Sequence, residues 1–200
     1  MNALHQTSLF GAGPPSFDPR IRGLTHQPLT DGAWVDHLDG WLQGHNGLFD
    51  SLVDDAHWSQ HRRKMYDRFV DVPRMVARCP QRGSAATILR RMSLALSMRY
   101  GVALPSISLA WYRDGQDSVA PHGDRLGGYT AQSVVAIVSI GEPRRFTLKP
   151  NRGGESKHYS LGWGDLIVMG GTCQDTWQHG VPKVACAQPR ISIVFRERDD

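Results

Sequence analysis

The chain has 200 residues, a length that favours one domain and excludes two large ones. Hydrophobic residues make up 40% and charged residues 21%, which is typical of a globular protein and excludes a largely disordered one. The net charge of +4 is too small to identify a nucleic-acid-binding protein, but 19 of the 23 basic residues are Arg, the side chain best suited to gripping carboxylates or phosphates.

The elements expected in the first half of the chain are mainly helical. Residues 1–30 are rich in Gly and Pro and are expected to be mostly irregular, with an entry strand at best. A helix is predicted to begin at Asp31 and to end at Gly44, because it places four large apolar residues on one face: Trp34, Leu38, Trp41 and Leu42. Residues 56–75 are basic and aromatic without a clear period, which favours an ordered loop or a short hairpin. A second helix is predicted from Ser84 to about Gly101.

After Pro105 the pattern changes to short apolar or alternating runs separated by turn residues, which predicts strands. We expect them near 106–112, 134–140, 145–149, 158–161, 165–169, 177–181 and 190–196. Helices followed by strands indicate an α+β domain in which the strands form a sandwich or barrel and the helices pack on one side. Residues 31–200 are expected to form this single domain, with its strand core at 106–196.

No run approaches the roughly 20 apolar residues of a membrane span, and no basic region followed by an apolar one opens the chain. The three cysteines form no C-x-x-C pair, which fits a reducing compartment. We therefore expect a cytoplasmic monomer without a membrane partner.

His122-Gly123-Asp124 is the first candidate for a metal site, because residues i and i+2 of an extended segment point to the same face. His179, next to a predicted strand, is the preferred third ligand, and His158 competes with it. Two His and one carboxylate would leave three positions open on Fe(II), and they also suit catalytic zinc. From these residues alone, a simple hydrogen-bonded His–Asp pair is an equally good interpretation.

Two other pairs of potential ligands, each with at least one histidine, are expected to lie on the surface. His37 and Asp39 repeat the H-x-D spacing, but on the first predicted helix they diverge by about 200° and cannot share a metal. His57 and His61 have helical spacing but lack an H-E-x-x-H motif.

Arg190 and Arg196 are separated by an even number of residues, so both face one side of a strand while Ile191, Ile193 and Phe195 face the other. Two cations directed into a protein interior need an anion, because burying them without one is costly. A dicarboxylate cosubstrate would satisfy them.

The chain from about Trp58 to Arg196 resembles the AlkB-type Fe(II)- and 2-oxoglutarate-dependent dioxygenases. The resemblance rests on five blocks in order: Trp111-Tyr112-Arg113-Asp114-Gly115, His122-Gly123-Asp124, Val135-Ala136-Ile137-Val138-Ser139-Ile140-Gly141, Gly164-Asp165-Leu166-Ile167-Val168-Met169, and His179 with Arg190-x5-Arg196. It implies a double-stranded β-helix, or jelly roll, and the use of Fe(II), 2-oxoglutarate and O2. By this resemblance His122, Asp124 and His179 bind iron. Arg190 pairs with the distal carboxylate of 2-oxoglutarate together with Tyr112, and Arg196 lies closer to the metal and its carboxylate ligand.

The same resemblance makes residues 56–80 a lid that grips nucleic acid, in which Val72-Pro73-Arg74 matches a family element. Arg62, Arg63, Lys64, Arg68 and Arg74 would meet phosphates, and Trp58, Tyr66 or Phe69 would stack on a flipped base. From Ala56 to Arg99 there are ten Lys plus Arg and two acidic residues, so this region alone carries +8. A solvated basic face with buried aromatics is the alternative.

The implied function is oxidative dealkylation of alkylated bases in DNA or RNA. Ala110, Ser192 and Val194 replace polar family residues near the cosubstrate, and Cys79 stands where relatives tend to have Tyr. The acidic residue that commonly follows H-x-D is replaced by Arg125-Leu126. That change favours the alternative of a hydroxylase or demethylase acting on a protein or small molecule. A catalytically silent nucleic-acid-binding jelly roll is the third possibility.

Overall fold

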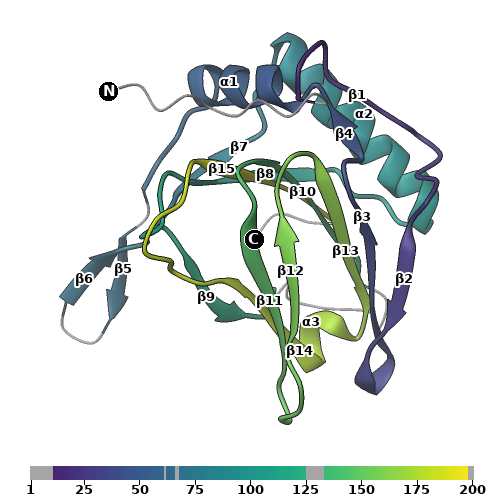
Figure 1. Cartoon of the computed structure of the whole chain (residues 1–200), viewed down its shortest axis with the longest axis vertical. Coiled ribbons are helices and arrows are strands. Elements are labelled where there is room, and N and C mark those ends of the chain that lie inside the picture. Colours follow the sequence, from purple (N-terminus) through teal and green to yellow (C-terminus); the bar gives the residue numbers. More distant parts are fainter. Residues whose placement is uncertain (1–10, 61, 66–67, 125–132, 198–200) are drawn as a thin grey trace.

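The structure is a computed structural model that describes residues 11–60, 62–65, 68–124 and 133–197; within 62–65 and 68–71 only the backbone is described. Two antiparallel sheets face each other (Figure 1). The larger sheet has seven strands in the order β2 (Thr25–Pro28), β3 (Ala33–Leu38), β13 (Asp165–Gly171), β10 (Val135–Gly141), β15 (Arg190–Arg196), β8 (Ser106–Tyr112) and β7 (Met75–Arg78). The smaller sheet has the order β12 (Lys157–Leu161), β11 (Arg144–Pro150), β14 (Trp177–Val181) and β9 (Val119–His122).

Two helices cover the outer face of the larger sheet. Helices α1 (His45–Asp55) and α2 (Gly83–Tyr100) lie on this face, and the short α3 (Cys173–Thr176) connects β13 to β14 (Figure 1). The remaining elements are small: η1 (Thr30–Gly32), the pair β1 (Ser16–Phe17) and β4 (Leu42–Gln43), and the hairpin β5 (Arg62–Met65) and β6 (Arg68–Asp71). The described part of the chain contains no helix long and apolar enough to cross a membrane.

The larger sheet separates two apolar cores. Its outer face packs on the helices, where Ile191, Ile193 and Phe195 of β15 join Leu89 and Met92 of α2 in one buried cluster. Its inner face packs on the smaller sheet in a second buried cluster that includes Val135, Ile137, Phe146, Leu148 and Leu161. A sheet buried on both faces needs apolar residues at successive positions, which explains the nearly continuous apolar run of β10. The α+β assignment and the jelly roll are confirmed.

The predicted helix beginning at Asp31 is wrong. Ala33–Leu38 is strand β3, and the helix α1 starts at His45, beyond the glycine at which the predicted helix was to end. Trp34 and Leu38 do share a face, but positions i and i+4 also share a face in a strand, because four is a multiple of two. Gly40, with a φ of 58°, lies in the turn that follows the strand.

In residues 11–30 the structure has two short strands, β1 and β2, where one entry strand at most was expected; β2 forms the edge of the larger sheet beside β3, and residues 1–10 lie outside the described residues. In the second half, all seven predicted strands are present, and β8, β14 and β15 have the predicted bounds. The second helix is also confirmed. The strands β7 and β9 were missed; each has only four residues.

Candidate active site

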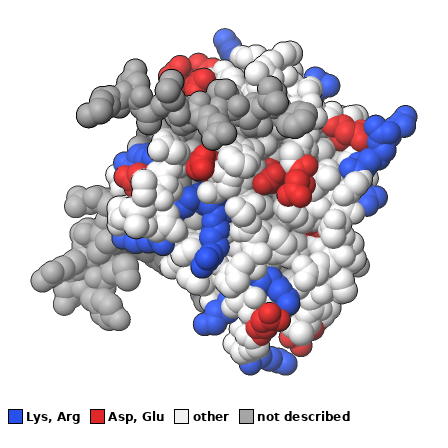
Figure 2. Space-filling view, in the orientation of Figure 1, with Lys and Arg blue, Asp and Glu red and all other residues white. Residues whose placement is uncertain are grey.

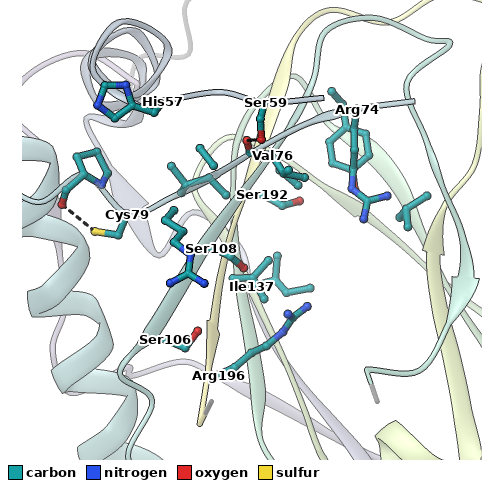
Figure 3. A pocket seen from close by; sticks show the side chains of 18 of the residues that line it. His57, Ser59, Arg74, Val76, Cys79, Ser106, Ser108, Ile137, Ser192 and Arg196 are labelled. Carbon is teal, nitrogen blue, oxygen red and sulfur yellow. Dashed lines mark hydrogen bonds between the residues drawn. The ribbon is translucent and has the colours of Figure 1, made fainter. Parts of the chain in front are cut away.

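A cavity of about 1200 Å³ opens between the two sheets. Alternate residues of β8 and β15 line it, including Ser108, Tyr112, Ser192 and Arg196, and His122 and His179 line it from the smaller sheet. Arg74 and Arg196 both project into this space (Figure 3). The cavity therefore brings together residues that lie far apart in the sequence.

His122, Asp124 and His179 meet at one place in the cavity. His122 of β9 and His179 of β14 are direct cross-strand partners, with ring centroids 4.4 Å apart. Asp124 Oδ1 lies 3.7 Å from His122 Nε2, and Asp124 Oδ2 lies 3.9 Å from His179 Nε2. One potential ligand atom from each residue lies within 4.8 Å of the others. These distances and this donor set could hold an octahedral ion such as Fe(II) with three positions open.

Neighbouring groups prepare these side chains for a metal. His122 Nδ1 donates to the Ala120 carbonyl oxygen at 2.9 Å, which leaves the Nε2 lone pair free for coordination. Burial lowers the pKa of His179 to about 4, although Asp124 opposes the shift, so this imidazole is neutral at pH 7. Arg196 Nη2 donates to Asp124 Oδ1 at 2.9 Å, as the sequence analysis expected for an arginine near the carboxylate ligand.

Glycine is the only residue type that fits at position 123, between the two candidate ligands of the H-x-D motif. An added Cβ would overlap the backbone carbonyl oxygen of Gln174, which belongs to α3. The Gln174 side chain in turn accepts a hydrogen bond from the Asp124 backbone N–H at 3.2 Å. These contacts with Gln174 of helix α3 thus fix the position of Asp124.

Arg190 is buried next to the cavity: it is not among the residues that line it, but its cross-strand partner Tyr112 is. Its side chain is fully buried, and its Nη2 donates to Ser139 Oγ at 2.7 Å. Its Nε and Nη1 are buried and have no hydrogen-bond partner in the described part of the chain. Tyr112 is its direct cross-strand partner, with the guanidinium carbon 5.3 Å from the ring centroid. Burial lowers the pKa of Arg190 to about 10, and a carboxylate bound here would relieve that cost.

The other histidine candidates are resolved by position. His158 lies on β12, where Nδ1 is 3.2 Å from Thr147 Oγ1, and it does not join His122 and Asp124. The interpretation of His37 and Asp39 as a divergent helical pair is wrong, because β3 is a strand and the two side chains approach to 3.4 Å. They form a second cluster with Asp165. The carboxylate of Asp165 already accepts hydrogen bonds from the backbone of Gly40 and Gly162, which ties two turns together.

The lid residues are placed in part. The β5–β6 hairpin confirms the predicted hairpin and carries Arg62, Arg63, Lys64 and Arg68; their side chains, that of Phe69, and Tyr66 lie outside the described residues. The hairpin extends from the body beside β9 (Figure 1), and Lys and Arg side chains are spread over the face shown in Figure 2.

Trp58 and Arg74 have different surroundings. Trp58 donates its indole N–H to the Leu52 carbonyl oxygen at 3.1 Å, and its ring lies 5.4 Å from that of Trp111, so it packs against the body of the protein. Arg74 lines the cavity and is close enough to His179 to contribute to the lowered pKa of that imidazole. Of the two, only Arg74 is positioned to meet a substrate inside the cavity.

Three contributors to the site were not found from the sequence: Gln174, Ser139 and Arg144. Each acts through a contact between segments that are distant in the chain. Ser139 gave a weak signal, because it is a polar residue inside an apolar strand.

Comparison with protein-family models supports the same chemistry. Residues 45–196 match the model described as the 2OG-Fe(II) oxygenase superfamily, which covers more than half of the chain. The matched range includes all three candidate metal ligands and the buried Arg144 and Arg190.

Curated relatives carry AlkB names. The chain is 26% identical over 171 residues to alpha-ketoglutarate-dependent dioxygenase alkB homolog 3 of Homo sapiens, covering 74% of this chain and 60% of that protein. It is 32% identical over 120 residues to DNA oxidative demethylase ALKBH2 of Arabidopsis thaliana, covering 48% of this chain and 38% of that protein. The matched region thus spans about 60% of the length of the human relative.

Solved structures support the fold. The structure of OsALKBH1 aligns with a TM-score of 0.59 at 12% identity, covering 87% of this chain and 100% of that one. A prolyl hydroxylase from Trichoplax adhaerens, in complex with a hypoxia inducible factor peptide fragment, aligns with a TM-score of 0.62 at 11% identity, covering 84% of each chain. At these identities the likeness establishes the shared jelly roll alone.

Proposed function

Because the chain belongs to the 2OG-Fe(II) oxygenase superfamily, we propose that it removes alkyl groups from bases in nucleic acid, using Fe(II), 2-oxoglutarate and O2. The observation that carries this proposal is the His122–Asp124–His179 cluster, in which Asp124 and His179 are buried; its two histidines line one cavity with Arg74 and Arg196. The AlkB names of the relatives support nucleic acid as the substrate class.

His122, Asp124 and His179 would hold the iron. Bound iron supplies the oxidising chemistry, and the protein supplies position and charge. The hydrogen bond from Arg196 fixes one oxygen of Asp124, while the other oxygen faces His179. A protein that binds nucleic acid but lacks an intact metal cluster could not catalyse the reaction. The His122–Asp124–His179 cluster therefore favours an enzyme over a catalytically silent binding protein.

Arg190 would bind the distal carboxylate of 2-oxoglutarate. Its two nitrogens without partners supply the donors, and Tyr112 lies beside it. Arg196, at the other end of β15, binds Asp124, so the 2-oxo acid end of the cosubstrate is expected on the side of Arg196 and the metal ligands.

The proposed reaction converts 2-oxoglutarate and O2 to succinate and CO2. One oxygen atom enters succinate, and the other forms a hydroxyl group on the alkyl carbon attached to the base nitrogen. The carbon–nitrogen bond then breaks, its electron pair stays with the nitrogen, and the alkyl group leaves as an aldehyde while its hydroxyl proton passes to the nitrogen or to solvent. A base can reach the cavity only if it leaves its stack, so single-stranded nucleic acid is the expected preferred form.

The lid would supply the grip on nucleic acid. Arg74 at the cavity and the basic residues of the β5–β6 hairpin, Arg62, Arg63, Lys64 and Arg68, are proposed to meet phosphates. Because Trp58 packs against Trp111, Tyr66 or Phe69 is the better candidate for stacking on the base.

A second candidate function is hydroxylation or demethylation of a protein or small molecule. The observation that favours it is Arg125, which follows Asp124 where the related dealkylases commonly have an acidic residue. The same iron and cosubstrate residues would serve this reaction, so only the substrate distinguishes the two functions.

A matched pair of histidine variants tests the proposal. Wild type, His122→Ala and His158→Ala are incubated with Fe(II), 2-oxoglutarate and a panel of oligonucleotides with N-alkylated bases, and lesion loss is read by mass. We expect loss with wild type and with His158→Ala, whose histidine lies outside the cluster, and none with His122→Ala. Full activity of His122→Ala would overturn the metal assignment. Turnover of 2-oxoglutarate without loss of any lesion would favour the second candidate.

A further inference from the structure

Arg144, the first residue of β11, is buried with only 3% of its surface exposed. Its guanidinium donates to three backbone carbonyl oxygens: Nη1 to Asp114 at 2.8 Å, and Nη2 to Asp117 at 3.1 Å and Pro182 at 2.9 Å. A planar guanidinium fixes the relative positions of groups that it binds together. Arg144 thus joins two segments of backbone that are far apart in the sequence.

These two segments border the cosubstrate residues. Residues 113–118 follow Tyr112 directly, and residues 182–189 lead directly into Arg190. The segments also touch each other, because the Val184 N–H donates to the Gly115 carbonyl oxygen at 2.9 Å. A Cβ added at Gly115 would overlap the Val184 carbonyl oxygen, so the approach is too close for a side chain.

An ion pair closes the first segment on itself. Asp117 accepts hydrogen bonds from Nε and Nη2 of Arg113 at 2.7 and 2.9 Å, and from the Arg113 backbone N–H at 2.9 Å. Arg144 then binds the backbone at both ends of the turn that includes Asp114 and Asp117. The loop after Tyr112 is therefore held by two arginines, one buried and one partly exposed.

Arg144 and Arg190 also act on each other by charge. Burial lowers the pKa of both side chains, and the positive charge of Arg144 is one of the groups that lower the pKa of Arg190. In the described part of the chain, neither guanidinium donates a hydrogen bond to a carboxylate. Tyr112 lines the cavity, and these two buried cations near it favour an anionic group there, although Asp114 and Asp117 offset part of the charge of Arg144.

We infer that Arg144 is a positioning residue for the distal carboxylate of the cosubstrate: it fixes the spacing of Tyr112 and Arg190 and adds positive potential, without touching the cosubstrate. The inference rests on the proposed use of 2-oxoglutarate and deepens it. It predicts that Arg144 discriminates between 2-oxo acids with and without a distal carboxylate. A residue that merely stabilised the fold would affect both kinds of 2-oxo acid alike.

The test is an anaerobic titration of Fe(II)-loaded protein, followed by visible charge-transfer absorbance, with 2-oxoglutarate and with 2-oxovalerate, which lacks the distal carboxylate. For Arg144→Met, the Kd for 2-oxoglutarate is expected to rise about tenfold, equivalent to about 1.4 kcal/mol, while that for 2-oxovalerate stays within about twofold. Arg144→Lys keeps the positive charge but loses the planar group that binds three carbonyl oxygens. Its Kd for 2-oxoglutarate should lie between those of wild type and Arg144→Met. Arg145→Met, at an exposed neighbouring position on β11, is the matched control and should change neither Kd.

The outcomes separate the inference from the proposed function. If wild type does not bind 2-oxoglutarate, the proposed function fails. If wild type binds it and Arg144→Met binds it equally well, or loses both 2-oxo acids in equal proportion, the inference is wrong. If Arg144→Met does not fold, Arg113→Gln loosens the same loop from its partly exposed side. It should raise the Kd for 2-oxoglutarate selectively, and an unchanged Kd would overturn the inference.

Discussion

Replacing Arg190 by Met should stabilise the protein in the absence of its cosubstrate. Arg190 is fully buried, and burial is the main cause that lowers its pKa to about 10, below the ordinary value of an arginine. A shift of this size corresponds to about 3 kcal/mol of unfavourable free energy for the charged side chain in the folded protein. Loss of the hydrogen bond to Ser139 Oγ destabilises the variant by about 1 kcal/mol. The free energy of unfolding should therefore rise by about 2 kcal/mol.

The measurement is urea unfolding at pH 7 of wild type and Arg190→Met, with and without 2-oxoglutarate plus Mn(II) as a stand-in for iron. Wild type should gain about 2.7 kcal/mol when the cosubstrate is at 100 times its Kd, because a ligand that binds only the folded state stabilises it. Arg190→Met should gain much less. Arg145→Met, at an exposed position, should stay within about 0.5 kcal/mol of wild type.

The reasoning is refuted if Arg190→Met is less stable than wild type by more than about 1 kcal/mol without cosubstrate, a difference larger than the hydrogen bond alone explains. It is equally refuted if 2-oxoglutarate stabilises both proteins to the same extent. Either result would mean that the buried guanidinium is part of the fold and is not a binding group held ready for a carboxylate.

Three further predictions concern the ligand motif, the loop after β8 and the lid. Gly123→Ala should lower iron affinity at least about tenfold, because the new methyl group overlaps the Gln174 carbonyl oxygen and displaces the adjacent ligand; metal titration measures this. Asp117→Asn should lose about 1–3 kcal/mol of stability at pH 7. Burial acts to raise the pKa of Asp117, but hydrogen bonds from Arg113 lower it overall. The stabilisation by the Asp117 carboxylate is therefore present above its pKa of about 3.9 in the unfolded chain and is lost as the pH falls through its lower pKa in the folded protein. The free energies of unfolding of wild type and Asp117→Asn should converge in urea near pH 2. Arg74→Gln should weaken binding to single-stranded oligonucleotides and reduce the slope of log affinity against log salt by about 0.7, and an unchanged slope in fluorescence anisotropy would place Arg74 away from phosphates.

The strands of the second half were predictable because short apolar runs between turn residues have one reasonable interpretation. The region before residue 45 was not, because the i, i+4 spacing of Trp34 and Leu38 satisfies a helix and a strand equally. The outcome is decided by β13, which pairs with β3 and buries it within the larger sheet. That pairing is a tertiary contact, and local periodicity does not contain it.

The site was predictable to the extent that its residues carry charge or metal-binding atoms. His122, Asp124 and His179 were grouped correctly in space, and Arg196 does bind the carboxylate of Asp124. Gln174 could not be found, because nothing about an isolated glutamine indicates that it meets a residue 50 positions away. The roles of these residues in iron and cosubstrate binding, the cytoplasmic location and the monomeric state stay predictions.

The modest net charge of the whole chain conceals an uneven distribution. Basic residues are in excess between Ala56 and Arg99, whereas Arg144 and Arg190 are buried in the second half of the chain. Under the proposed function the arginine-rich composition serves two purposes, a basic outer region and a buried anion site. Only the first of these depends on nucleic acid as the substrate.

The central claim is tested most directly by the stoichiometry of the reaction with N-alkylated single-stranded oligonucleotides. Succinate, aldehyde and repaired base are quantified together by mass spectrometry after incubation of the wild-type protein with Fe(II), 2-oxoglutarate and O2. The account predicts that the aldehyde and the repaired base appear in equal amounts, with at least as much succinate. Succinate formation that is unaffected by every alkylated oligonucleotide, with no repaired base, would contradict it.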